Sequence, residues 1–206
     1  MTSWLHEERL AAVIGAIRAS GARSVLDLGC GEGDLILRLL GVPEIERIAG
    51  VDLSLPALER LRAALKTRQD GGRVKLLHGS MIAPPPGLTG FDCAALVETI
   101  EHLAPETLSR LETALFGGLR PRTVAITTPN VEFNGLLGVK PGRFRRPDHR
   151  FEWGRARFRA WAAGVAARTG YGVAHEDIAG RHPTLGGASQ MAVFTRAAGV
   201  FESDGS

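Results

Sequence analysis

The sequence predicts an α/β fold in which a mostly parallel seven-stranded sheet has helices on both faces and an antiparallel hairpin at one edge. Over most of the 206 residues, short apolar runs alternate with segments of helical periodicity, which is typical of a parallel sheet. The last two apolar runs have no helix between them. Antiparallel strands need no helical crossover, so this pair is expected to form the hairpin.

The elements follow one another in a regular order along the chain. The first helix is expected at 4–20, where apolar residues recur at helical spacing until Gly21. Further helices are expected at 35–40, from Leu55 with Pro56 in its first turn, at 105–115 and at 156–167. The strands are expected at 23–28, 47–52, 74–78, 91–97, 122–128, 173–179 and 190–195.

Composition narrows the class of protein. A chain of 206 residues with 44% hydrophobic content can bury one substantial core, so a single domain spanning 1–206 is expected. No apolar run approaches the roughly 18 residues that span a bilayer, and the polar start lacks the order of a secretory signal. Cys30 and Cys93 fall in a glycine turn and a core strand, where a disulfide is not expected. These features predict a cytoplasmic protein with no membrane partner.

A glycine-rich loop follows the first strand and precedes a helix. Its sequence is Asp27-Leu28-Gly29-Cys30-Gly31-Glu32-Gly33. Glycines allow a tight turn and a close approach to a ligand. Asp52 ends the next strand, where an acid is placed to accept hydrogen bonds from ribose hydroxyls. Carboxylates beside a pyrophosphate would repel it, so Asp27 and Glu32 favour a cationic ligand with an amino group over a nicotinamide dinucleotide.

This combination resembles the S-adenosylmethionine loop of class I methyltransferases, which have a Rossmann-like fold, over residues 20–130. The resemblance implies an adenine contact at Ser80, with Met81 available to pack on the ring. The implied cofactor-binding residues are Asp27, Gly29, Gly31, Glu32, Asp52 and Ser80.

An acidic stretch follows the fourth strand. If the chain turns helically there, Glu98, Glu101 and His102 stand at i, i+3 and i+4 and share one face. In an open α/β sheet, ligands collect at the carboxyl ends of the strands, so these side chains are expected to face the cofactor crevice. Carboxylate oxygens and an imidazole nitrogen suit a divalent cation. A solvated acidic first turn is the alternative.

Two later motifs add to this stretch. Thr-Pro-Asn-Val-Glu-Phe-Asn spans 128–134, and Asp-His-Arg-Phe-Glu-Trp spans 148–153 with a histidine at 149. Together with Glu98-x-x-Glu101-His102, they resemble the Hen1 family, the small-RNA 2′-O-methyltransferases that modify the 3′-terminal nucleotide. The resemblance implies that Glu98, Glu101, His102 and His149 are metal ligands and carry the catalysis. The other histidines, at positions 6, 78, 175 and 182, are expected to lie at the surface or satisfied in the core.

The family chemistry implies the substrate as well. The cation is held by both hydroxyls of the terminal ribose, so the RNA needs a free 2′,3′-diol at its 3′ end. Two imidazoles favour Mn²⁺ or Co²⁺ over Mg²⁺, which prefers oxygen ligands; Mn²⁺ or Mg²⁺ is the expected cation. Bacterial relatives work with an RNA end-repair protein, which makes such a protein a candidate partner. The additional domains of known relatives have no counterpart in this chain.

A basic segment at 131–160 is expected to complete the metal site and the RNA site. Between positions 140 and 159 it carries eight basic residues against two acidic ones, with four aromatic residues interleaved. Clustered arginines track a phosphate backbone, and aromatic rings among them can stack on bases, although Trp153 is expected in the core rather than on a base. The basic residues are Lys140, Arg143, Arg145, Arg146, Arg150, Arg155, Arg157 and Arg159, and the aromatic residues are Phe144, Phe151, Trp153 and Phe158.

Two other functions stay open. One is a metal-independent S-adenosylmethionine methyltransferase for a small molecule, active in chelator and indifferent to RNA. The other is a catalytically silent RNA-binding subunit, which would bind RNA without consuming cofactor. The intact metal set at Glu98, Glu101, His102 and His149 argues against the silent subunit.

Overall fold

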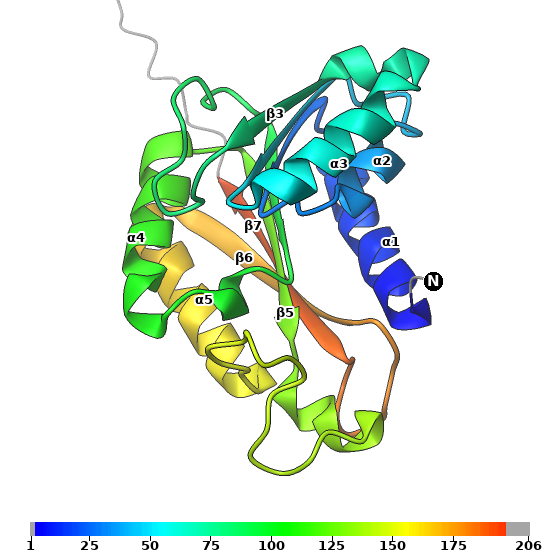
Figure 1. Ribbon diagram of the computed structural model, residues 1–206. Helices are drawn as coiled ribbons and strands as arrows, with labels where there is room; N and C mark the ends of the chain where they lie inside the picture. Colours follow the sequence, from blue (N-terminus) through cyan, green and yellow to red (C-terminus); the bar gives the residue numbers. More distant parts are fainter. Residues whose placement is uncertain (1–2, 197–206) are drawn as a thin grey trace, which may run out of the picture.

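Seven strands form one sheet in the computed structural model, which describes residues 3–196 (Figure 1). The order is β3-β2-β1-β4-β5-β7-β6, and β7 runs antiparallel to both β5 and β6 while the other neighbours are parallel. The predicted fold class is confirmed. The strands are β1 Ser24–Leu28, β2 Arg47–Asp52, β3 Val74–His78, β4 Cys93–Val97, β5 Thr123–Pro129, β6 Tyr171–Ile178 and β7 Ser189–Arg196.

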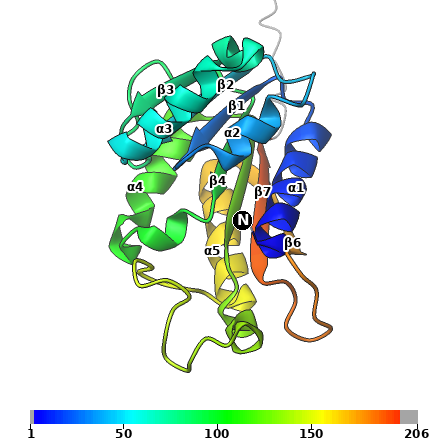
Figure 2. The ribbon, with the colours of Figure 1, turned by 45° about the vertical axis from the view of Figure 1, so that its right-hand side comes forward.

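Helices cover both faces of this sheet (Figures 1 and 2). One face carries α1 Trp4–Ala19, α2 Asp34–Leu39 and α3 Leu55–Lys66, and the other carries α4 Leu108–Glu112 and α5 Arg155–Thr169. Two apolar cores result, one on each side of the sheet. Central strands contribute to both cores because successive side chains alternate between the faces. Leu26 packs on the α4 and α5 side, and Val25 on the α1 side.

The first helix forms for local reasons as well as for packing. The Ser3 hydroxyl accepts a hydrogen bond from the backbone N–H of His6, which caps the helix start. Leu10, Val13 and Ile17 lie on one face and are buried against the sheet. The helix therefore presents its first turn to the carboxyl ends of β1 and β4.

The helix expected at 105–115 is longer and composite. It begins as a 3₁₀ turn at Pro105–Thr107, continues as α4, and ends in a π-helical segment, Thr113–Leu119. Gly117 and Gly118 lie in this wide segment, and glycine lowers the cost of leaving α geometry. The other expected helices and strands are present within a few residues of their predicted ends.

Long connections gather at the carboxyl ends of the parallel strands. The chain leaves β5 through a 3₁₀ helix at Val131–Leu137 and a loop to α5, and both extend beyond the sheet at the lower end of Figure 1. The loop between β6 and β7 runs beside them (Figure 1). Within residues 3–196, no helix is long and apolar enough to cross a bilayer.

Candidate functional site

The three side chains Glu101, His102 and His149 converge at the carboxyl end of β4. Each offers one ligand atom, and these atoms lie within 4.8 Å of one another. Glu101 and His102 come from the 3₁₀ turn Ile100–His102, and His149 comes from the loop before α5. The two imidazole rings stand edge to face, with centroids 4.9 Å apart. Residues 47 positions apart in the sequence therefore meet at a potential cation site.

Glu101 is the most unusual member of the cluster. It is fully buried; Oε2 accepts a hydrogen bond from the Thr128 hydroxyl, while Oε1 has no hydrogen-bond partner among the described residues 3–196. Burial, and then the nearby Glu98 carboxylate, raise the pKa of Glu101 well above its usual range. A buried carboxylate oxygen without a partner is costly unless something else binds it. A divalent cation fits this requirement.

The two histidines are oriented by acids. His149 is buried, and its Nδ1 lies 2.6 Å from Glu152 Oε1. A metal-binding histidine usually donates its second ring nitrogen to a carboxylate in this way, which leaves Nε2 as the ligand. His102 Nδ1 lies 3.3 Å from Asp148 Oδ2. Burial lowers the pKa of His102 below its usual range, which favours the neutral imidazole that a metal needs.

Glu98 lies apart from these three ligands. The expected helical turn begins only at Ile100, and Glu98 itself adopts a left-handed backbone with φ of 52°, which is strained for a non-glycine residue. Its Oε1 accepts from the Thr127 hydroxyl at 3.1 Å and pairs with Arg9 Nε at 3.3 Å. Glu98, Glu101, His102 and His149 nevertheless line one cavity of about 390 Å³, together with Arg9.

The glycine loop lies next to this cavity. Gly29 and Gly31 have positive φ values, and Gly31 donates its N–H to Asp52 Oδ2 at 2.7 Å. A Cβ on Gly29 would lie 2.5 Å from Thr99, whereas a Cβ on Gly31 would meet nothing within 4 Å. The loop therefore packs tightly at Gly29 and leaves open space above Gly31.

Two further cavities flank the loop. One of about 310 Å³ is lined by Asp27, Gly31 and Glu32, and another of about 270 Å³ by Asp52, Gly79 and Met81. Gly29 and Glu98 line both. Burial, and then Asp52, raise the pKa of Asp27 to about 7. An aminoacyl group and a nucleoside would find separate compartments here, with Glu98 at their junction and at the edge of the metal cavity.

Ser80 does not line these cavities, although its neighbours Gly79 and Met81 do. The Ser80 hydroxyl accepts a hydrogen bond from the Ile82 N–H at 3.3 Å. Glu32 lies at the surface, where Oε1 pairs with Arg60. The structure thus brings most of the predicted cofactor residues together around the loop, and places Ser80 just outside.

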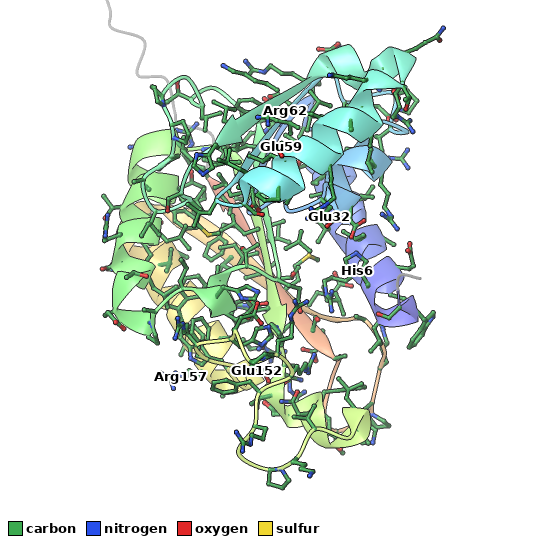
Figure 3. All side chains as sticks on the ribbon, in the orientation of Figure 1. His6, Glu32, Glu59, Arg62, Glu152 and Arg157 are labelled. Carbon is green, nitrogen blue, oxygen red and sulfur yellow. The ribbon has the colours of Figure 1, made fainter. Side chains whose placement is uncertain are left out.

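Sequence reasoning missed His6 and Arg9 in the first turns of α1. His6 was expected to lie at the surface or in the core, but it lines both the metal cavity and the glycine-loop cavity, as Arg9 does. Arg9 contacts His6 Nδ1 at 3.2 Å, and His6 Nε2 contacts Asp34 at 3.1 Å. Figure 3 shows His6 and Glu32 on one side of the strand ends, away from Glu152. The i, i+3 spacing of His6 and Arg9 puts them on one face of the helix, but it does not show that this face meets the strand ends.

The predicted motifs at 127–134 and 148–153 have structural roles that their sequences did not reveal. Thr127 and Thr128 donate to the two acids described above. Asn134 donates to Glu152 Oε2 at 2.6 Å, and the Arg145 backbone N–H donates to Glu152 Oε1 at 2.7 Å. The Arg150 N–H donates to the Glu101 carbonyl at 2.7 Å. These bonds fix the His149 loop against β5 and the acidic turn.

The expectation for the basic segment needs correction. Trp153 is buried in the core as expected, but Phe151 and Phe158 are buried too, so none of the three can stack on bases. Phe151 stacks on Trp153, with ring centroids 4.2 Å apart. Arg145 is part-buried and donates to three acceptors within the protein. Arg155 pairs with Glu132 and Asp177, and Arg159 with Asp177. The exposed members of the segment are Lys140, Arg143, Phe144, Arg146, Arg150, Arg157 and Arg159.

Comparisons with known proteins group this chain with methyltransferases. Residues 25–122 match the family model described as a methyltransferase domain. The chain is 36% identical to the small RNA 2′-O-methyltransferase of Xenopus tropicalis, over 93% of this chain and 55% of that protein. It is 31% identical to the Arabidopsis thaliana protein of the same name, over 97% of this chain and 23% of that protein. The chain thus spans about half, or less, of the length of these curated relatives.

Solved structures extend the comparison. The methyltransferase domain of bacterial CtHen1 superposes with a TM-score of 0.84 at 38% identity, covering 94% of this chain and all of that one. A chain of the Pnkp1/Rnl/Hen1 RNA repair complex shares the fold at 22% identity, with a TM-score of 0.69. Because a full-length match at this identity to the CtHen1 domain accompanies the fold, the chain belongs to the Hen1 methyltransferase family.

Proposed function

We propose that this chain transfers the methyl group of S-adenosylmethionine to the 2′-OH of the 3′-terminal nucleotide of RNA, in a reaction that depends on a divalent cation. One observation carries the proposal: the unpartnered, buried Oε1 of Glu101 lies with His102 and His149 beside the glycine-loop cavities. A cation bound at such a cluster would lower the pKa of a substrate hydroxyl, which suits transfer to a ribose 2′-OH. The names of the relatives supply the substrate class.

The cofactor site is proposed to use the carboxylates and the glycine loop. Asp27 faces the cavity where the amino group of the cofactor would neutralise it, and Gly31 leaves room for the aminoacyl chain. Asp52 already accepts N–H groups from Gly31 and Ser54, so it holds the loop while its remaining lone pairs are available to the ribose. Gly29 and Glu32 line the same compartment. Ser80 is proposed to contact the edge of the adenine from just outside.

The metal site is proposed to use Glu101, His102 and His149, with Glu98 as the fourth ligand. When bound, a divalent cation lowers the pKa of a hydroxyl that it coordinates and so favours a nucleophile near neutral pH. Two imidazole nitrogens favour Mn²⁺ over Mg²⁺. Glu152 and Asp148 orient the two rings whichever cation is used.

The reaction follows from placing two substrates side by side. The 2′ oxygen of the terminal ribose bonds to the sulfonium methyl carbon, the carbon–sulfur bond breaks, and S-adenosylhomocysteine leaves with both electrons of that bond. The hydroxyl proton passes to solvent or to a neighbouring carboxylate. Since Glu98 lines the cofactor cavities and the metal cavity, it stands where the two substrates would meet. An adjacent 3′-OH completes a chelating pair, which restricts the reaction to a free RNA end.

RNA selection is proposed to involve the exposed basic residues of the 131–160 segment. Single-stranded binding through these residues would weaken as salt rises. An RNA end-repair protein is proposed as a partner, because a chain of this fold occurs in an RNA repair complex. Copurification of the chain with such a protein from its native cell tests this part of the proposal.

Methyl transfer to short RNAs tests the main proposal. Two RNAs that differ only at the end, with a 2′,3′-diol or with a 3′-phosphate, are incubated with Mn²⁺, with Mg²⁺ or with chelator. We expect transfer only to the diol, with loss in chelator and in His149→Ala but not in His175→Ala, a half-buried histidine on β6. Transfer that survives chelation would favour a metal-independent enzyme. RNA binding without transfer would favour a silent subunit.

A further inference from the structure

The segment Arg143–Arg146 is held rigidly beside the metal cavity. Arg145 is its anchor: Nε donates to Asn134 Oδ1, Nη1 to the Ala188 carbonyl and Nη2 to the Asn130 carbonyl. These three bonds use donors on all three guanidinium nitrogens and tie the segment to β5 and to the start of β7. The guanidinium therefore serves the fold and is not free to bind a phosphate.

The same anchor is coupled to a metal-cluster histidine. Glu152 Oε1 accepts from the Arg145 backbone N–H at 2.7 Å and lies 2.6 Å from His149 Nδ1. One oxygen thus bridges the peptide between Phe144 and Arg145 and the imidazole of His149. The backbone that carries Phe144 and Arg146 is therefore tied to a residue of the metal cluster, which suits a role in positioning substrate.

Phe144 differs from the other aromatic side chains of the basic segment. Its side chain is 45% exposed, whereas Phe151, Trp153 and Phe158 are buried. Exposure of a phenyl ring to water is unfavourable. Leu136 and Leu137, on the preceding 3₁₀ helix, are exposed as well, so apolar and basic side chains both reach the surface in this part of the chain.

Arg146 lies on the other side of the anchor. It is exposed and lines both the metal cavity and the glycine-loop cavity. Its guanidinium has one acidic contact, Asp148 Oδ1 at 3.4 Å, and that acid also contacts His102 through its other oxygen. Such an exposed pair is weak, so the guanidinium can exchange Asp148 for a phosphate at little cost.

We propose that Phe144 and Arg146 form a nucleotide cradle: Phe144 stacks on a base at the 3′ end of the RNA, and Arg146 binds the phosphate on the 5′ side of the terminal ribose. The inference rests on the proposed function and adds to it the residues that position the RNA end. Phe144 and Arg146 flank the anchored Arg145 in the sequence, so a phenyl ring is available for a base and a guanidinium for a nearby phosphate. Stacking tolerates any base, so the cradle does not select sequence.

RNA oligonucleotides carrying 2-aminopurine at the last or the penultimate position test the cradle directly. Stacking on Phe144 quenches the fluorescence, and we expect this quenching with the wild-type chain, its loss in Phe144→Ala and its recovery in Phe144→Trp. RNA affinity should fall about tenfold or more in Phe144→Ala. The apparent affinity for S-adenosylmethionine, measured without RNA, should not change.

Arg146 has a matched control in Arg181, whose side chain is 85% exposed on the β6–β7 loop. Arg146→Ala should lower the slope of log affinity against log salt by about 0.7, the value for one phosphate contact on a single strand, and Arg181→Ala should leave it unchanged. Unchanged quenching in Phe144→Ala, or equal salt slopes in both arginine variants, would overturn the cradle. Either result would favour a protein as the partner of the exposed Phe144. Absence of methyl transfer by the wild-type chain would instead refute the proposed function.

Discussion

Replacement of Glu152 by glutamine tests whether Glu152 orients His149 in the metal cluster, as the structure indicates. Oε1 accepts from the Arg145 N–H and lies 2.6 Å from His149 Nδ1, while Oε2 accepts from Asn134 Nδ2. A glutamine has only one acceptor oxygen, so its amide must face either the Asn134 amide or the Arg145 and His149 donors. Asn134 cannot flip to compensate, because its Oδ1 accepts from Arg145 Nε.

The loss can be estimated from these contacts. The variant leaves one donor unpaired and removes the negative charge that faces the part-buried Arg145. Leaving a buried donor without a partner costs roughly 1–3 kcal/mol. For a chain of this length, each kcal/mol lowers the unfolding midpoint by about 2–4 °C, so the midpoint should fall by roughly 2–12 °C. Metal affinity should fall about 10- to 100-fold as well, because the His149 ring loses its orienting carboxylate.

Thermal unfolding in chelator measures the first effect, and calorimetric titration with Mn²⁺ measures the second. Glu132→Gln is the matched control, since Glu132 makes three contacts with Arg155 at the surface of the same region. Exposed pairs contribute about 0–1 kcal/mol, so this control should unfold near the wild-type midpoint. If Glu152→Gln is as stable as Glu132→Gln and binds Mn²⁺ normally, the proposed support of His149 is wrong.

Two further predictions concern buried carboxylates. Glu101→Gln should raise the unfolding midpoint of the metal-free chain, because it replaces a buried carboxylate whose Oε1 has no partner among residues 3–196. It should also abolish the increase in midpoint that Mn²⁺ gives the wild type, and a retained Mn²⁺ effect would contradict the ligand role. Burial raises the pKa of Asp27 from 3.8 to about 7, so the folded chain holds a proton that the unfolded chain releases. The Asp27 contribution to the free energy of unfolding should therefore be full below about pH 4 and fall, by at most about 4 kcal/mol, as the pH rises to about 7. Denaturant titrations of wild type and Asp27→Asn at a series of pH values isolate this contribution, and parallel curves would contradict it.

The fold could be predicted because its determinants are local. Alternating apolar runs and helical periods set the strands and helices, and the absence of a helix between the last two strands identified the antiparallel edge. The glycine loop was recognisable for the same reason, since tight turns require residue types at fixed spacing. The convergence of Glu101, His102 and His149 also followed a general rule, that side chains at the carboxyl ends of parallel strands share one crevice.

What the sequence could not reveal depends on contacts between distant residues. Arg9 pairs with Glu98 across 89 positions, and no local pattern marks an arginine in an amphipathic helix as the partner of a strand-end acid. The basic segment was overestimated as an RNA surface because charge counts ignore partners: Arg145 and Arg155 are occupied within the protein. Phe151 and Phe158 are interleaved with arginines in sequence, yet their rings turn inward to the core.

The two predicted carboxylate ligands, Glu98 and Glu101, differ in the charges and hydrogen-bond donors that surround them. Glu101 lacks a cationic partner and a hydrogen bond at Oε1, so it gains directly from a bound cation. Glu98 already has Arg9 at 3.3 Å and the Thr127 hydroxyl, so a cation must compete with a guanidinium for the same oxygen. Arg9 also contacts His6 and Ser189. Displacement of its guanidinium from Glu98 would therefore alter contacts in α1 and at the start of β7. On the proposed function, the buried cluster would therefore supply the cation affinity, whereas Glu98 would link cation binding to the position of α1, which lines the cofactor-loop cavity through His6 and Arg9.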